Sequence, residues 1–123
     1  MITNNVLLGL ISYIIVKHLV ADFLIQNRFP YMWKNKGTYG HMGGILHAFS
    51  NVFLTIPLAI YFGNWIPLLV ELVTHYHIDW AKMAFNKKHN LTCNASAQFW
   101  DTLGLDQALH YLIYVWMLDY WVL

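Results

Sequence analysis

Residues 6–24 read VLLGLISYIIVKHLVADFL, and this stretch decides the fold. Its side chains are apolar apart from Ser12, Lys17, His18 and Asp22. A helix needs about 20 predominantly apolar residues to cross a bilayer core that is roughly 30 Å thick. The stretch therefore predicts a membrane-spanning helix over about residues 6–25.

Three further apolar stretches follow along the chain, and they cover about residues 44–62, 65–85 and 105–123. Of the 123 residues, 59% are hydrophobic and 11% are charged. A soluble domain carries about 25% charged residues, which is more than this chain can offer to water. The sequence therefore predicts an all-α protein, in which residues 1–123 form one integral membrane bundle of four transmembrane helices.

Basic residues are concentrated in two of the three connections between these spans. They are Arg28, Lys34 and Lys36 in the first connection, and Lys87 and Lys88 in the third. The short second connection carries no charge. Because cytoplasmic loops carry an excess of Lys and Arg, we predict a bacterial inner-membrane protein with its basic loops in the cytoplasm and both termini outside.

The composition also limits which classes of binding partner are expected. A net charge of +1 gives no basic patch for a nucleic acid, so none is expected. Membrane lipid is the expected surrounding, and a lipid-linked molecule is the expected substrate if the protein is an enzyme. A homo-oligomer is compatible with the sequence.

Each predicted span carries histidine or carboxylate side chains, and three of the spans contain such residues at a spacing of four. They are His18 and Asp22 in the first span, His47 in the second, Glu71, His75 and Asp79 in the third, and Asp106 and His110 in the fourth. Residues four apart share one face of a helix. Since the helices alternate in direction, we expect these stripes to meet in the cytoplasmic half of the bundle.

Such residues are costly inside a membrane and need a compensating role. Imidazole and carboxylate groups are ligands for zinc, iron and manganese. The sequence therefore predicts a divalent metal, with zinc preferred and iron or manganese as alternatives. The predicted ligands are His18, Asp22, His47, His75, Asp79, Asp106 and His110.

A catalytic function follows if the metal keeps an open position, because the bound water then becomes a nucleophile near neutral pH. Glu71 or Asp106, if not bound to the metal, is the predicted general base. Lys82, one turn beyond Asp79, is predicted to meet a substrate phosphate. The leading hypothesis is a metal-dependent hydrolase of a lipid or lipid-linked phosphate.

Two other classes use the same residue types. Histidines and aspartates can hydrogen-bond between helices and fix their packing, as in a structural or lysis-related membrane protein. They can also line a pathway for ions or protons. A bound metal that is open to solvent favours the hydrolase, and a polar path through the whole bundle favours transport.

Four motifs in order carry a resemblance. They are His18-x-x-x-Asp22-Phe23 with Gln26, Leu46-His47-Ala48, His75-x-x-Ile78-Asp79-Trp80 with Lys82, and Asp106-Gln107-x-x-His110. Together they resemble a family of small bacterial and phage membrane proteins of unknown function. The resemblance implies the membrane bundle and the site residues, and it implies no reaction.

A weaker likeness is to inner-membrane proteins described as metal-dependent hydrolases. It rests on His41 and His47 as a histidine pair before a helix, followed by His75 and Asp79. This likeness implies hydrolysis as the role of the metal.

Overall fold

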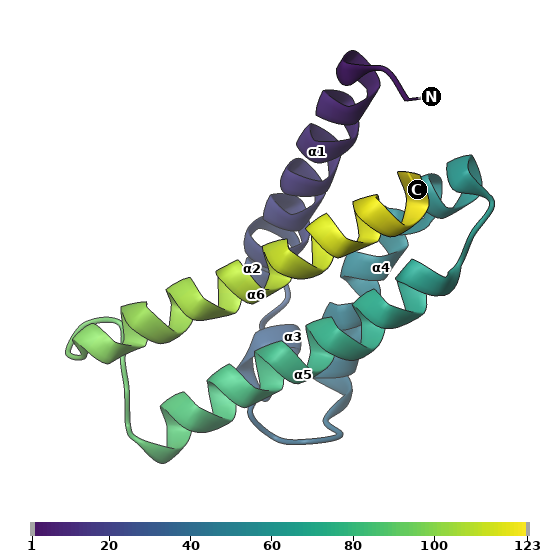
Figure 1. Ribbon diagram of the computed structural model, residues 1–123. Helices are drawn as coiled ribbons and strands as arrows, with labels where there is room; N and C mark the ends of the chain where they lie inside the picture. Colours follow the sequence, from purple (N-terminus) through teal and green to yellow (C-terminus); the bar gives the residue numbers. More distant parts are fainter. Residues whose placement is uncertain (1, 123) are drawn as a thin grey trace.

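Helices occupy all four of the apolar stretches in a computed structural model that describes residues 2–122 (Figure 1). The elements are α1 (Asn4–Leu19), the π-helical turn η1 (Val20–Ile25), α2 (Gln26–Arg28), α3 (Pro30–Lys34), α4 (Met42–Phe62), α5 (Ile66–Lys88) and α6 (Ala97–Val122). The all-α prediction is thereby confirmed. The predicted end of the fourth span, Leu123, lies outside the described residues.

The helix boundaries depart from the predicted spans in two places. The connection after the first span was expected to be a loop, but it contains the short helices α2 and α3. Pro30 begins α3, where its missing N–H group costs nothing and its fixed φ suits a helix. Helix α6 begins at Ala97, eight residues before the predicted span, because hydropathy reports the apolar part of a helix and not its polar first turns.

The turn between α4 and α5 is tight. Gly63 ends α4 in the left-handed conformation, with φ at 65°, which a glycine adopts without steric cost. The Asn64 side-chain oxygen then accepts a hydrogen bond from the Ile66 N–H, and Pro67 occupies the first turn of α5. These residues reverse the chain and set α5 antiparallel to α4.

Figure 1 shows α5 and α6 side by side in opposite directions, with α1 crossing α6 obliquely. The first turn of α1 and the last turn of α6 lie toward the same end as the α4–α5 turn. The α5–α6 connection and helix α3 lie toward the other end. This arrangement is the one expected if the long helices cross a membrane in alternation.

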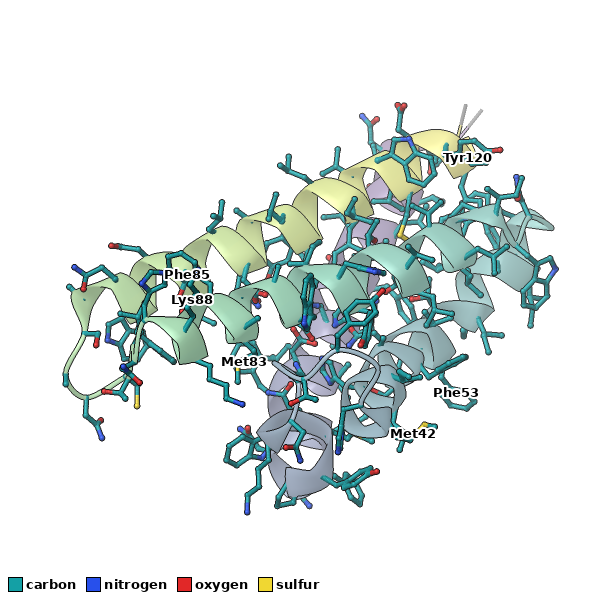
Figure 2. The ribbon with its side chains drawn as sticks, turned by 90° about the horizontal axis from the view of Figure 1, so that it is seen from below. Met42, Phe53, Met83, Phe85, Lys88 and Tyr120 are labelled. Carbon is teal, nitrogen blue, oxygen red and sulfur yellow. The ribbon has the colours of Figure 1, made fainter. Side chains whose placement is uncertain are left out.

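Large apolar side chains cover much of the outside of the helices. The inside holds both a buried apolar core, which includes Ile14, Ala59 and Met117, and a set of buried polar side chains. Phe53 is 70% exposed, and Figure 2 shows it and Met42 pointing away from the helices. The buried polar side chains are Lys17, His18, Asp22, Lys36, His47, Asn51, Thr55, Glu71, His75, Asp79, Asn86, Asp106 and His110. A water-soluble protein has the opposite distribution, since ionisable groups are rarely fully buried there.

Two helical segments are long and apolar enough to be candidate membrane spans. They are Asn4–Arg28, of 25 residues, and Met42–Phe62, of 21 residues. Helices α5 and α6 have 23 and 26 residues, which is long enough, but they carry more polar side chains. The prediction of four spans is supported for α1 with its extension and for α4, and it stays a prediction for α5 and α6.

Candidate metal centre

Two histidines and two aspartates converge where η1, α4 and α5 meet. Asp22 comes from the π-helical turn, His47 from α4, and His75 and Asp79 from successive turns of α5. All four side chains are buried, and one ligand atom from each lies within 4.8 Å of the others. This cluster, called the four-ligand group below, could hold a metal ion.

The distances within the four-ligand group are short and even. His47 Nε2 lies 3.1 Å from Asp22 Oδ1 and 3.1 Å from Asp79 Oδ2. His75 Nε2 lies 3.1 Å from His47 Nε2 and 3.5 Å from each of the same carboxylate oxygens. A tetrahedral zinc ion with bonds of about 2.0–2.1 Å separates its ligand atoms by roughly 3.3 Å. The side chains therefore stand at the spacing of a tetrahedral ligand set.

Hydrogen bonds alone do not satisfy this arrangement. His47 Nε2 has two carboxylate oxygens and a second imidazole nitrogen at 3.1 Å, yet a ring nitrogen carries at most one proton. The Nδ1 atoms of His47 and His75 are buried without a hydrogen-bond partner among the described residues. A cation between the four atoms would attract every one of them at once.

Two neighbours contact the ligand atoms of the four-ligand group. The Asn51 amide nitrogen lies 3.0 Å from Asp22 Oδ1 and 3.1 Å from His75 Nε2, so a cation bound at His75 Nε2 would replace the Asn51 hydrogen bond there. Lys36 is buried, and its Nζ donates to Asp79 Oδ2 at 2.6 Å. The lysine had been predicted to lie in a basic surface loop, and the structure instead places it inside the molecule.

A second group shares Asp79 with the first. Asp79 Oδ1 lies 3.3 Å from His110 Nε2, which is in turn 3.7 Å from Asp106 Oδ1. Asp79, Asp106 and His110 each offer a ligand atom within 4.8 Å of the others. Lys82 Nζ lies 3.1 Å from Asp106 Oδ2. The structure thus places Lys82 against a carboxylate of the site.

His18 lies beside both groups without belonging to either. Its Nε2 is 3.3 Å from Asp22 Oδ2 and 2.9 Å from Gln107 Oε1, and its Nδ1 is 2.9 Å from the Tyr114 hydroxyl. These contacts orient Asp22 from the side away from His47. The predicted role of His18 as a ligand stays a prediction.

Glu71 lies one turn before His75 in α5 and is paired with Lys17 of α1, with both side chains buried. Lys17 Nζ also donates to the Tyr114 hydroxyl at 3.1 Å. Glu71 is therefore linked to His18 through Lys17 and Tyr114. Its predicted role as general base stays a prediction, and of the two candidate bases Asp106 lies within a ligand group.

The π-helical turn η1 positions Asp22. Its backbone bonds widen the helix, as shown by the Gln26 N–H that donates to the Ala21 carbonyl five residues earlier. Single π turns inside α-helices are frequent at functional sites. In this turn Ala21 and Asp22 are both buried, so the widened segment directs the carboxylate into the bundle.

Two glycines at the start of α4 admit the segment that carries Lys36. A Cβ atom on Gly43 would collide with the Tyr31 carbonyl oxygen. A Cβ atom on Gly44 would lie 3.3 Å from the Tyr76 ring and 3.8 Å from the Lys36 Cα. This close approach lets Lys36 reach Asp79 from outside α5.

Sequence reasoning missed three members of the network. Tyr114 follows His110 by four residues, so the spacing of four that links the other site residues applies to it as well. An aromatic side chain in a predicted span, however, suggests lipid contact. Gln107 stands in the motif with Asp106 without a predicted role, yet its amide nitrogen donates to Asp106 Oδ2 and its amide oxygen lies 2.9 Å from His18 Nε2. Lys36 lies outside the long helices, where no periodicity predicts which side chain turns inward.

The histidine pair behind the weaker likeness is not brought together as ligands. His41 precedes α4, and its Nδ1 accepts a hydrogen bond from the Gly43 N–H at 3.0 Å. This capping contact satisfies a free donor at the helix start. Of that pair, His47 alone lies in the four-ligand group.

Two pockets lie against the ligand groups. A polar pocket of about 120 Å³ is lined by Asp22, Gln26, Lys36, Lys82 and Gln107, among others. An apolar groove of about 420 Å³ between α5 and α6 is lined by Lys82 and Asp106 and otherwise mostly by apolar side chains. Lys82 lines both spaces, so a charged group in one and an apolar chain in the other would meet at this residue.

Comparison with known proteins gives a family. Residues 10–123 match the family described as "Protein of unknown function (DUF3307)". No curated protein and no solved structure matches the chain.

Proposed function

The chain belongs to this family of proteins of unknown function, and because its description assigns no activity, we propose a function from the site itself. The protein is a membrane-embedded metal protein that binds a divalent cation, preferably zinc, through the four-ligand group. The observation that carries the proposal is the set of buried donor atoms at separations of 3.1–3.5 Å.

Charge supports a divalent cation. The four-ligand group offers two carboxylates and two imidazoles, and neutral imidazole is the form that binds metal. Asp79 already has Lys36 as a partner, whereas the oxygens of Asp22 face imidazole and amide groups. The two carboxylates with Lys36 leave one net negative charge, which attracts a cation into a site from which water is largely excluded.

The membrane location is supported by the distribution of side chains. Long apolar side chains cover the outside of α4 and α1, while each of the four long helices, with η1 as the extension of α1, buries at least one ionisable group. His77 in α5 and Asp119 in α6 are exposed exceptions. Ionisable residues inside a membrane bundle face its interior and pair with one another. We propose that α5 and α6 cross the membrane with α1 and α4, and that their polar faces are shielded by the bundle.

The catalytic part of the proposal is a metal-dependent hydrolase of a lipid or lipid-linked phosphate. Lys36 and Lys82 line the polar pocket beside Asp22, and ammonium groups bind phosphate oxygens. The neighbouring apolar groove suits the hydrocarbon part of the same molecule. In this function Lys82 holds the phosphate charge, and Asp106 is the candidate base or ligand.

The metal proposal is tested by metal analysis of the protein purified in detergent after growth with added zinc. We expect bound metal in the wild type and a large loss in Asp79→Asn and His75→Gln, because a neutral amide is a weaker ligand than carboxylate or imidazole. The matched controls are Asp101→Asn and His89→Gln, both exposed, which should keep the wild-type metal content. A metal-free wild type whose melting temperature does not respond to chelator would leave the packing function in its place.

The hydrolase proposal is tested with phosphatidic acid in mixed detergent micelles as the probe. We expect metal-dependent phosphate release that His75→Gln abolishes. Lys82→Ala should raise KM, because it removes a charge that holds the phosphate. A metal-loaded wild type that releases no phosphate from this probe or from a polyprenyl phosphate would contradict the hydrolase.

A second candidate function is a proton pathway, which one observation favours. Hydrogen bonds and the ion pair connect Asp22, His18, Tyr114, Lys17 and Glu71 in sequence, so polar contacts continue beyond the ligand groups. Proton flux into liposomes that Glu71→Gln abolishes would favour this function. Liposomes as tight as protein-free ones would exclude it.

A further inference from the structure

We propose that the protein binds a second divalent cation at Asp79, Asp106 and His110, so that Asp79 bridges two metal ions. The inference rests on the proposed function, since it takes the four-ligand group as the first metal position. It adds the position at which a metal-bound water and a substrate oxygen would be accommodated.

The two oxygens of Asp79 face different partners. Oδ2 lies 3.1 Å from His47 Nε2 and 3.5 Å from His75 Nε2, and Oδ1 lies 3.3 Å from His110 Nε2. A carboxylate whose two oxygens face two different sets of ligand atoms has the geometry of a bridging ligand. Two-metal hydrolytic sites hold their ions about 3.5–4 Å apart, a distance that one bridging carboxylate can span.

Asp106 supplies an independent observation. It is 2% exposed, and its Oδ1 is buried without a hydrogen-bond partner among the described residues. This oxygen lies 3.7 Å from His110 Nε2, while Oδ2 is held by Lys82 and by the Gln107 amide. Buried acceptors are normally satisfied by a protein group, a water or an ion, so this carboxylate oxygen beside an imidazole is a position at which a cation could bind.

The second position differs from the first in its number of ligands. The four-ligand group offers four protein ligands, which is the number found in structural zinc sites. Asp79, Asp106 and His110 provide three ligands, which is the number found in catalytic sites that keep one open position. Asp106 and Lys82 also line the apolar groove between α5 and α6, so this position lies next to a space that a substrate can enter.

Charge predicts that an anion accompanies the second cation. Asp22, Asp79 and Asp106 are balanced in part by Lys36 and Lys82, so two divalent cations would leave the buried site strongly positive. Phosphate in the polar pocket, which both lysines line, would offset this excess. The second cation should therefore bind more tightly when phosphate is present.

The test is manganese binding to the full chain in detergent, with and without inorganic phosphate. We expect two manganese ions per chain in the wild type and one in Asp106→Asn and His110→Gln. The exposed control Asp101→Asn should bind two. A wild type that saturates at one ion overturns the second site and leaves the first intact, whereas a wild type that binds none overturns the proposed function itself.

Electron paramagnetic resonance of the wild type gives a readout that does not depend on how the variants fold. Two manganese ions bridged by Asp79 should give an exchange-coupled spectrum. Two bound ions with uncoupled spectra would show that Asp79 does not bridge them, and would overturn the proposal. Tighter binding of the second ion with phosphate supports it, and equal binding with and without phosphate contradicts the expected charge coupling.

Discussion

Lys17 and Glu71 join α1 to α5 by a buried ion pair. Removal of one partner leaves an unpaired charge inside the bundle, which costs about 3–5 kcal/mol. We therefore expect Lys17→Met to lower the free energy of unfolding by that amount. The double variant Lys17→Met with Glu71→Leu should recover most of the loss, because apolar side chains of similar volume need no partner.

The measurement is unfolding of the four proteins in mixed micelles, with the exposed Lys88→Met as the control. The control should unfold like the wild type. Equal stability of the single and double variants would mean that Glu71 finds another partner when Lys17 is absent.

Single residues differ in how far the sequence predicts them. His75 and Asp79 could be placed because spacing by four residues and membrane depth both constrain a long helix. Lys36 could not, since its inward position depends on how closely α3 and the residues after it approach α4. That approach is a tertiary contact, which no local pattern encodes.

At the level of elements, the start of α4 depends on Gly43. Because a Cβ there would collide with the Tyr31 carbonyl oxygen, Gly43→Ala should destabilise the protein by about 1–3 kcal/mol, as overpacking does. Thermal melting measures the effect.

Gly104→Ala in α6 is the matched control. A Cβ on Gly104 would have no neighbour within 4 Å, and alanine favours a helix by about 1 kcal/mol over glycine. This variant should be as stable as the wild type or more so. If both alanine variants have the same stability, the close approach at Gly43 does not limit the stability of the protein.

The elements themselves were predictable in position and less so in detail. Apolar runs located the four long helices, because about 20 consecutive apolar residues are typical of a helix that spans a bilayer. The π-helical turn was not predictable, since residues 20–25 are ordinary helix formers whose backbone pattern is set by what packs against them. The early start of α6 was missed because its first turns are polar.

For the whole molecule, the orientation in the membrane can be tested with the natural cysteine. Cys93 is exposed in the connection between α5 and α6, which is predicted to lie in the cytoplasm. A membrane-impermeant maleimide should therefore label the wild type in lysed spheroplasts and leave it unlabelled in intact ones. The difference would report whether the reagent reaches the cytoplasmic side, since the Cys93 thiol itself is exposed in both preparations.

Asn4→Cys in a Cys93→Ser background is the control, because Asn4 begins α1 at the opposite end of the fold. It should be labelled in intact spheroplasts. The reverse pattern would invert the predicted topology, and labelling of both positions in intact spheroplasts would contradict alternating spans.

The two helices most able to enter a bilayer alone, α1 and α4, are also the first made. Helices α5 and α6 are made afterwards. Lys36, which is made before α5, is the partner of Asp79, and Lys82 of α5, which is made before α6, is the partner of Asp106. Asp79 and Asp106 thus each meet an ammonium group during synthesis. Under the proposed function, the bundle would assemble in metal-starved cells, and metal loading would be a separate, later event.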